Sequence, residues 1–175
     1  MSRTSIEQRA FAEVRATGRR LEGYAATFGS EANLGAFTEI IAPGAFRTAL
    51  AGDVLAFLDH DPAKVLGRTR SGTLRLSEDA RGLAFSLDVP DTQAGRDVLA
   101  LAERGELGGM SFGFTVPTGG DQWDGERRTL NTVALKEVSV VQAWPAYPNT
   151  EVAVRSRPIG NPRRRRALRL AEAAP

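Results

Sequence analysis

Alternating apolar and polar positions recur along the chain and predict a fold made mainly of β-strands. The clearest case is residues 73–76 and 83–89, where apolar side chains occupy every second position on both sides of a polar turn at residues 78–82. These two segments are typical of an antiparallel hairpin. We expect further strands at residues 11–16, 20–28, 37–41, 54–58, 65–69, 110–116 and 132–141, and a polar hairpin tip at residues 118–128.

Two segments carry helix signals instead. Residues 91–104 have Asp91 or Thr92 as an N-cap, apolar side chains at helical spacing and a glycine that ends the segment. A shorter helix at residues 44–50 is expected after Pro43. The pattern as a whole predicts an α+β domain in which antiparallel strands dominate.

Composition narrows the classes of protein that fit. A chain of 175 residues is long enough for one domain with a hydrophobic core and short for two. No run approaches eighteen apolar residues, and the first residues lack the apolar stretch of a signal peptide, so we expect neither membrane insertion nor secretion. The absence of cysteine and the presence of a single histidine, His60, exclude disulfides, a thiol nucleophile and histidine-rich or thiolate metal centres. We therefore expect no metal and no cofactor.

Charge divides the chain into an acidic body and a basic end. Up to residue 150 the chain holds 16 Lys and Arg against 19 Asp and Glu, whereas the last 25 residues hold 7 Arg against 2 Glu. We expect a globular domain over residues 1–155 and a flexible Pro- and Arg-rich tail over residues 156–175. The run from Arg163 to Arg166 favours either a solvated, disordered terminus or an electrostatic tether to an acidic protein surface or, nonspecifically, to nucleic acid.

A serine framed by glycines is the first candidate for chemistry. In the strand at residues 110–116, a methionine and two phenylalanines share one face, which we expect in the core, while Ser111 and Gly113 share the other. Together with Gly108 and Gly109, Gly113 is expected to keep this second face bare and to leave space for a substrate backbone beside the Ser111 hydroxyl. The alternative is that the glycines only turn a helix into a strand and Ser111 is a passive surface residue.

His60 carries the only imidazole of the chain, so it is the only candidate general base for Ser111 that titrates near neutral pH. It follows the strand at residues 54–58 directly. Asp59 and Asp61 are poor choices to orient its ring, because immediate neighbours in an extended backbone project the opposite way. A carboxylate from another part of the chain is required.

Glu137 is the candidate for that carboxylate. Strand alternation places it on one face with Val133, Leu135, Ser139 and Val141. A carboxylate in such a largely apolar row needs a cationic or hydrogen-bonding partner, and His60 would supply one. The alternatives are an ion pair with Arg127 or Arg128, or a register that leaves Glu137 in solvent.

Five motifs occur in one order along the chain: residues 39–46 (EIIAPGAF), 57–61 (FLDHD) with 66–69 (LGRT), 79–83 (DARGL), 109–114 (GMSFGF), and 137–141 (EVSVV) through Pro145-Ala146. In this arrangement the sequence resembles the tailed-phage prohead maturation protease family over residues 9–153. The resemblance implies a barrel-like, mostly antiparallel β core with flanking helices, as in the related herpesvirus assemblin proteases. It also implies Ser111 as nucleophile, His60 as base and Glu137 as the third catalytic member; in assemblins this member is a second histidine, which the chain lacks.

The function implied by the resemblance is that of a serine endopeptidase inside the assembling procapsid, in the host bacterial cytoplasm. Its expected substrates are scaffold or the N-terminal extension of the major capsid protein, and itself, with self-association inside the prohead. Candidate oxyanion or substrate-binding groups are the backbones of Gly109, Gly113, Gln142 and Ala143. The alternatives are a catalytically inactive β-rich scaffolding module of a phage-like particle and a protein that binds nucleic acid through its tail.

Overall fold

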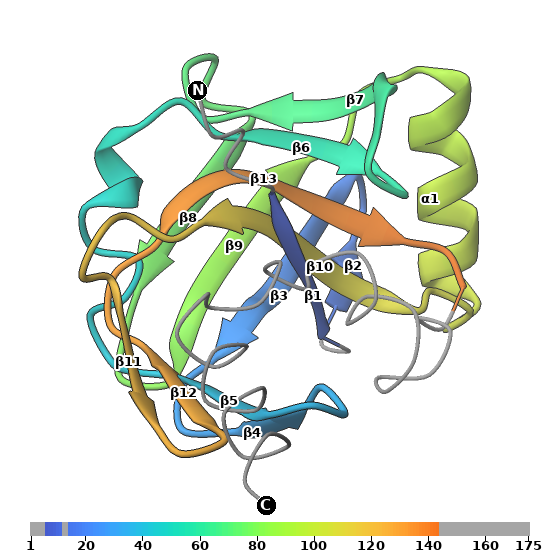
Figure 1. The fold of residues 1–175 in the computed structure, drawn as a ribbon. Coiled ribbons are helices and arrows are strands. Elements are labelled where there is room, and N and C mark those ends of the chain that lie inside the picture. The colour runs from blue at the N-terminus through green and yellow to red at the C-terminus, as the bar shows by residue number, and fades with distance from the viewer. Residues whose placement is uncertain (1–5, 12–13, 144–175) are drawn as a thin grey trace, which may run out of the picture.

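The computed structural model describes residues 6–11 and 14–143, and the predicted tail over residues 156–175 lies outside them. Its elements in chain order are β1 (Glu7–Phe11), β2 (Val14–Thr17), β3 (Arg20–Thr27), β4 (Glu31–Asn33), β5 (Thr38–Ile41), the 3-10 turn η1 (Ala49–Ala51), β6 (Leu55–Leu58), β7 (Asp61–Arg68), β8 (Leu74–Glu78), β9 (Gly82–Asp88), α1 (Gln93–Glu103), β10 (Gly109–Thr115), β11 (Asp121–Asp124), β12 (Arg127–Leu130) and β13 (Ala134–Val141). These strands form three sheets (Figure 1).

The largest sheet has five strands in the order β1-β10-β13-β6-β7, and its pairs are antiparallel except for the parallel pair β13–β6. A second sheet, β2-β3-β9-β8, is antiparallel throughout, and the third, β11-β12-β5-β4, contains the parallel pair β12–β5. The prediction of mostly antiparallel strands is therefore confirmed. The predicted barrel-like closure with several helices is wrong for the described residues, since each sheet keeps two edge strands and α1 is their only α-helix.

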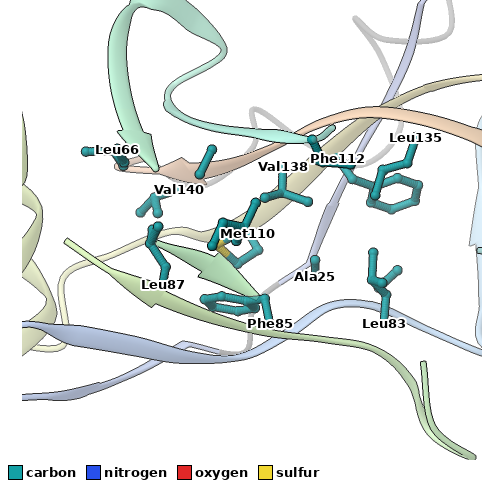
Figure 2. Close-up of a cluster of buried hydrophobic side chains, with 14 of the residues drawn as sticks. Ala25, Leu66, Leu83, Phe85, Leu87, Met110, Phe112, Leu135, Val138 and Val140 are labelled. Atoms are coloured by element: carbon teal, nitrogen blue, oxygen red, sulfur yellow. The ribbon is translucent and has the colours of Figure 1, made fainter. Parts of the chain in front are cut away.

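The hydrophobic core lies between the five-stranded sheet and the β2-β3-β9-β8 sheet. Met110 and Phe112 of β10 and Val138 and Val140 of β13 face the side chains of β9, with Met110 near Leu87 and Phe112 above Leu83, and all six are at most 2% exposed (Figure 2). The predicted core face of β10 is confirmed. Because alternate residues of a strand point to opposite faces, the same register turns the intervening residues of β10 and β13 away from this core.

The two predicted helices have different outcomes. The helix α1 is confirmed, with Thr92 as its N-cap accepting a hydrogen bond from the Gly95 amide at 3.2 Å. The helix expected at residues 44–50 is wrong: the segment forms turns that end in η1. Gly44 has φ +93°, outside the helical region, and the Phe46 amide donates to Glu78 Oε2 rather than to a preceding carbonyl.

The strand expected at residues 11–16 is two strands in different sheets, because β1 pairs with β10 while β2 pairs with β3. The polar segment at residues 118–128 does contain a hairpin, β11–β12, but its second strand continues to Leu130 and pairs with β5. Arg128 is therefore 7% exposed rather than at a solvated tip.

No helix of the described residues is long and apolar enough to cross a membrane.

Arg128 belongs to a buried charge cluster that joins the five-stranded sheet to the β11-β12-β5-β4 sheet. Its guanidinium contacts Glu7 at 2.6 Å, Asp121 at 2.8 Å and Glu39 at 3.1 Å, and Arg9 contacts Glu39 at 2.6 Å. Burial by itself opposes the charge of Arg128. The hydrogen bond and charge of Glu7, with Asp121 and Glu39, outweigh that effect and raise the pKa of the guanidinium.

The cluster predicts a strong dependence of stability on Arg128. Replacing it by Met (Arg128→Met) leaves three carboxylates with Arg9 as the remaining cation, and we expect the free energy of unfolding to fall by about 3–5 kcal/mol in urea titrations. Arg127→Met is the matched control, because Arg127 is exposed and pairs with the exposed Glu31, so its loss is expected to cost less than about 1 kcal/mol. Equal stability of the two variants would contradict a structural role for the cluster.

Candidate active site

Adjacent strands of the five-stranded sheet bring the predicted site residues into one region. Ser111 of β10 lies opposite Ser139 of β13, and Gly113 lies opposite Glu137. On the other side of β13, β6 runs parallel to it, and His60 follows the end of β6. The site is therefore built across β10, β13 and the β6–β7 turn.

His60 occupies a tight turn with an unusual backbone. Asp59 and His60 have φ values of +51° and +60°, and they connect Leu58 to its partner Asp61 across the β6–β7 hairpin. A two-residue hairpin of this kind requires positive φ at both positions, which residues other than glycine rarely adopt. Asp59 secures the turn, because its amide donates to the Val140 carbonyl at 2.9 Å and its Oδ1 accepts from the Gln142 amide at 2.9 Å.

The turn directs the imidazole of His60 toward Glu137. The Nδ1 atom of His60 lies 2.7 Å from Glu137 Oε1, with the Glu137 side chain 9% and the His60 side chain 22% exposed. The expected alternatives for Glu137 do not occur: Arg127 pairs with Glu31 and Arg128 with the buried charge cluster. The structure thus pairs the carboxylate with the imidazole.

A second donor reaches the same carboxylate. Ser139 Oγ, which is fully buried, donates to Glu137 Oε2 at 2.5 Å. Each oxygen of the Glu137 carboxylate therefore has its own partner, one from β13 itself and one from the β6–β7 turn. Sequence reasoning placed Ser139 on this face but gave it no role, although its position two residues after Glu137 was the available signal.

A β-bulge decides which face of β13 carries Glu137. Gly113 pairs with Glu137 and the next residue, Phe114, pairs with Leu135, so Lys136 is an extra residue without a partner on β10. Leu135 consequently lies in the core cluster with Val138 (Figure 2). The prediction that Leu135 shares a face with Glu137 is wrong, because the extra residue interrupts the strict alternation on which it depended.

Gly113 makes room for the carboxylate. A Cβ atom built at this position would overlap Glu137 Oε1 and lie 3.1 Å from its carboxyl carbon. Ser111 on the same face is 2% exposed. The expectation of a bare face beside Ser111 is therefore wrong: in this structure Glu137 fills the space that Gly113 leaves.

The hydroxyl of Ser111 has a partner that the sequence did not indicate. Ser111 Oγ donates to the backbone carbonyl of Arg9 in β1 at 2.7 Å. Within residues 6–11 and 14–143, no hydrogen bond joins it to His60. The structure brings His60 and Glu137 into contact, and it places Ser111 on the neighbouring strand with its hydroxyl turned toward β1.

Comparison with known proteins identifies the family. The family model described as caudovirus prohead serine protease matches residues 5–164. The chain belongs to this family. Membership implies a peptidase of the serine type with a role in tailed-phage capsid maturation, and it agrees with the resemblance drawn from the motifs. No curated protein and no solved structure matches the chain significantly.

The backbones of Gly109, Gly113, Gln142 and Ala143, the candidates for an oxyanion site, have different surroundings in the structure. The Gln142 amide is engaged by Asp59, and Ala143 is exposed at the end of the described segment. Gly109 is buried and paired with Val141, and Gly113 lies against Glu137. Among the described residues of the prohead protease, no cluster of three or more His, Cys, Asp or Glu side chains is placed to hold a metal ion.

The contact between Gly113 and Glu137 predicts a coupled pair of substitutions. Gly113→Ala should displace the carboxylate and destabilise the fold, because the new methyl group would overlap it. Glu137→Asp shortens the side chain and should cost less in the Gly113→Ala background than in the wild type. We expect a coupling energy above about 0.5 kcal/mol from urea titrations of the four proteins. Strictly additive effects would show that the two positions do not compete for space.

Proposed function

We propose that the chain is a serine endopeptidase in which Ser111 is the nucleophile, His60 the general base and Glu137 the group that orients His60. The observation that carries this proposal is the 2.7 Å hydrogen bond between His60 Nδ1 and the buried carboxylate of Glu137. A serine protease of the serine-histidine-carboxylate type holds its imidazole in this way, with the second nitrogen left for the nucleophile. Membership of the prohead protease family supports the serine peptidase activity in this proposal.

The hydrogen bond between His60 and Glu137 determines which nitrogen of the imidazole carries the proton. An ionised carboxylate accepts and cannot donate, so the Nδ1 atom of His60 carries the proton in the bond to Glu137. The Nε2 atom then presents a lone pair, and no hydrogen bond occupies it within the described part of the chain. Glu137 would also stabilise the imidazolium that forms when Nε2 accepts a proton.

Ser111 must change its hydrogen-bond partner before it can react. Its hydroxyl now donates to the Arg9 carbonyl, and rotation about the Cα–Cβ bond would release it toward the His60 side of the sheet. Catalytic hydrogen bonds commonly form only when substrate is bound. We therefore interpret the Ser111–Arg9 contact as a resting arrangement of the nucleophile.

The proposed reaction gives each of these residues one role. Ser111 Oγ attacks the carbonyl carbon of the scissile peptide while His60 Nε2 takes the hydroxyl proton. The imidazolium returns that proton to the departing amine, and an acyl-enzyme remains. Water attacks the ester with the same nitrogen as base, which releases the new carboxyl terminus and restores Ser111.

The family suggests where this activity operates. We infer that the substrates are scaffold or the N-terminal extension of the major capsid protein, cleaved inside the assembling procapsid, and that the chain also cleaves itself. A targeting or removable function for residues 156–175, self-association in the prohead and a fold likeness to herpesvirus assemblin proteases remain predictions. Nonspecific contact of the tail with nucleic acid is a separate prediction, testable by salt-dependent binding.

A catalytically inactive scaffolding module is the second candidate function. The observation in its favour is the Ser111 hydroxyl, which is buried and bound to Arg9 rather than to His60. Such a module would need Ser111 only as a structural hydroxyl. The two candidates therefore differ in whether substrate cleavage depends on the Ser111 hydroxyl.

Cleavage of a precursor distinguishes the two functions. Wild type and Ser111→Ala are incubated at matched concentrations with the scaffold or capsid protein precursor, and products are followed by mass spectrometry. We expect cleavage by the wild type and none by Ser111→Ala, while Ser86→Ala, which lies on β9 in another sheet, should cleave normally. Equal cleavage by wild type and Ser111→Ala would refute Ser111 as the nucleophile.

The orienting role of Glu137 predicts a large loss of turnover from an isosteric change. Glu137→Gln keeps the shape but removes the charge that holds the Nδ1 proton, so we expect the rate of cleavage to fall on the order of 10⁴-fold. Circular dichroism should show a folded protein. Normal turnover by this variant would place the orienting group elsewhere.

A further inference from the structure

Ser139 is a buried hydroxyl that the proposed reaction does not use. It lies in the middle of β13, with Ser111 of β10 on one side of it in the sheet and Phe57 of β6 on the other. Its side chain is fully buried, and its Oγ donates to Glu137 Oε2 at 2.5 Å. The Glu137 carboxylate also binds the imidazole of His60, so the Ser139 hydroxyl can affect the orientation of that imidazole through Glu137.

We propose that Ser139 is a positioning residue, which holds the Glu137 carboxylate in the plane that presents Oε1 to His60 Nδ1. This inference rests on the proposed function, since it assigns how the orienting group of that site is itself oriented. The two hydrogen bonds use different oxygens of one carboxylate, 2.7 Å to the imidazole and 2.5 Å to the hydroxyl. Rotation of the carboxylate would lengthen both bonds together.

The need for a second donor follows from the freedom of a glutamate side chain. The terminal torsion of glutamate has a broad energy profile, so a single hydrogen bond to His60 does not determine the plane of the carboxylate. No arginine or lysine pairs with Glu137 within the described residues, and Gly113 supplies space beside it but no side-chain donor. Ser139 is the group that supplies the second constraint.

The same geometry separates the roles of the two serines. The hydroxyl of Ser139 donates to the carboxylate oxygen that does not face His60, so its proton points to Glu137 and not to the imidazole. The hydroxyl of Ser111 is bonded to a backbone carbonyl and is independent of Glu137. Loss of Ser139 should therefore weaken the site through His60, whereas loss of Ser111 should remove the nucleophile and leave His60 bonded to Glu137.

The imidazole proton of His60 can be observed by itself, because His60 is the single histidine of the sequence. An untagged chain labelled with [15N]histidine should give one imidazole Nδ1–H proton signal, far downfield because of its short bond to a carboxylate. We expect this signal to move upfield and to exchange faster with water in Ser139→Ala, and to stay in place in Ser111→Ala. Ser86→Ala is the matched control, since it removes a hydroxyl that also donates to a glutamate, Glu22, in another sheet.

A second measurement reports the reactivity of the nucleophile. The rate of labelling by a fluorophosphonate probe, which reacts with an activated serine, should fall about 10–100-fold in Ser139→Ala, the size of effect typical when the outer partner of a metal-ligating histidine is lost. Ser139→Thr keeps the hydroxyl and should restore most of the rate. Labelling should be absent in Ser111→Ala and unchanged in Ser86→Ala.

The outcomes separate the two proposals. An Nδ1–H signal that is the same in Ser139→Ala as in the wild type overturns the positioning role, whether or not labelling falls. Failure of the wild type to react, or labelling that persists in Ser111→Ala, overturns the proposed function instead. The histidine signal does not depend on activity, so it tests Ser139 even in that case.

Discussion

The arrangement of the site depends on one constraint, the burial of the Glu137 carboxylate at the centre of a sheet. A buried carboxylate is costly unless donors surround it, and the three strands nearby are arranged to meet that requirement. Gly113 leaves the space, Ser139 supplies a donor from the same strand, and the β6–β7 turn adopts a strained backbone to bring His60 to the remaining oxygen. A surface carboxylate would need none of these features, and it would hold an imidazole less firmly.

A second group of buried charges connects the site to the rest of the fold through Arg9. Its guanidinium is bound by Glu39 and lies over the ring of Phe114, while its backbone carbonyl accepts the hydroxyl of Ser111. The edge strand β1 is thereby held against β10 by backbone pairing and by the contact of Arg9 with Phe114, while its ionic contacts join it to β5 and β12. The Ser111 hydroxyl is thus linked to the position of β1, and through it to the sheet that carries Glu39 and Arg128.

Much of this structure was predictable from the sequence where local patterns govern it. Strict alternation located β8 and β9, and capping chemistry located α1. Alternation also brought out Ser111 and Glu137 as candidates, and the presence of a single histidine brought out His60. What local patterns could not indicate were effects of tertiary pairing: the bulge at Lys136, the attachment of β1 to β10 and the burial of Arg128 among carboxylates distant in sequence. Each of these depends on residues that the periodicity of a single segment does not contain.

The order of strands in the five-stranded sheet also has a consequence for the way the protein is made. The contact between His60 and Glu137 spans 77 residues of sequence, and that between Arg9 and Ser111 spans 102. Contacts of such long range form late in folding because the loops between them must first close. A nascent chain that has not yet released β13 from the ribosome possesses the imidazole and the serine but no carboxylate beside them. His60 therefore has no carboxylate partner until β13 is inserted, and the proposed site stays incomplete during translation.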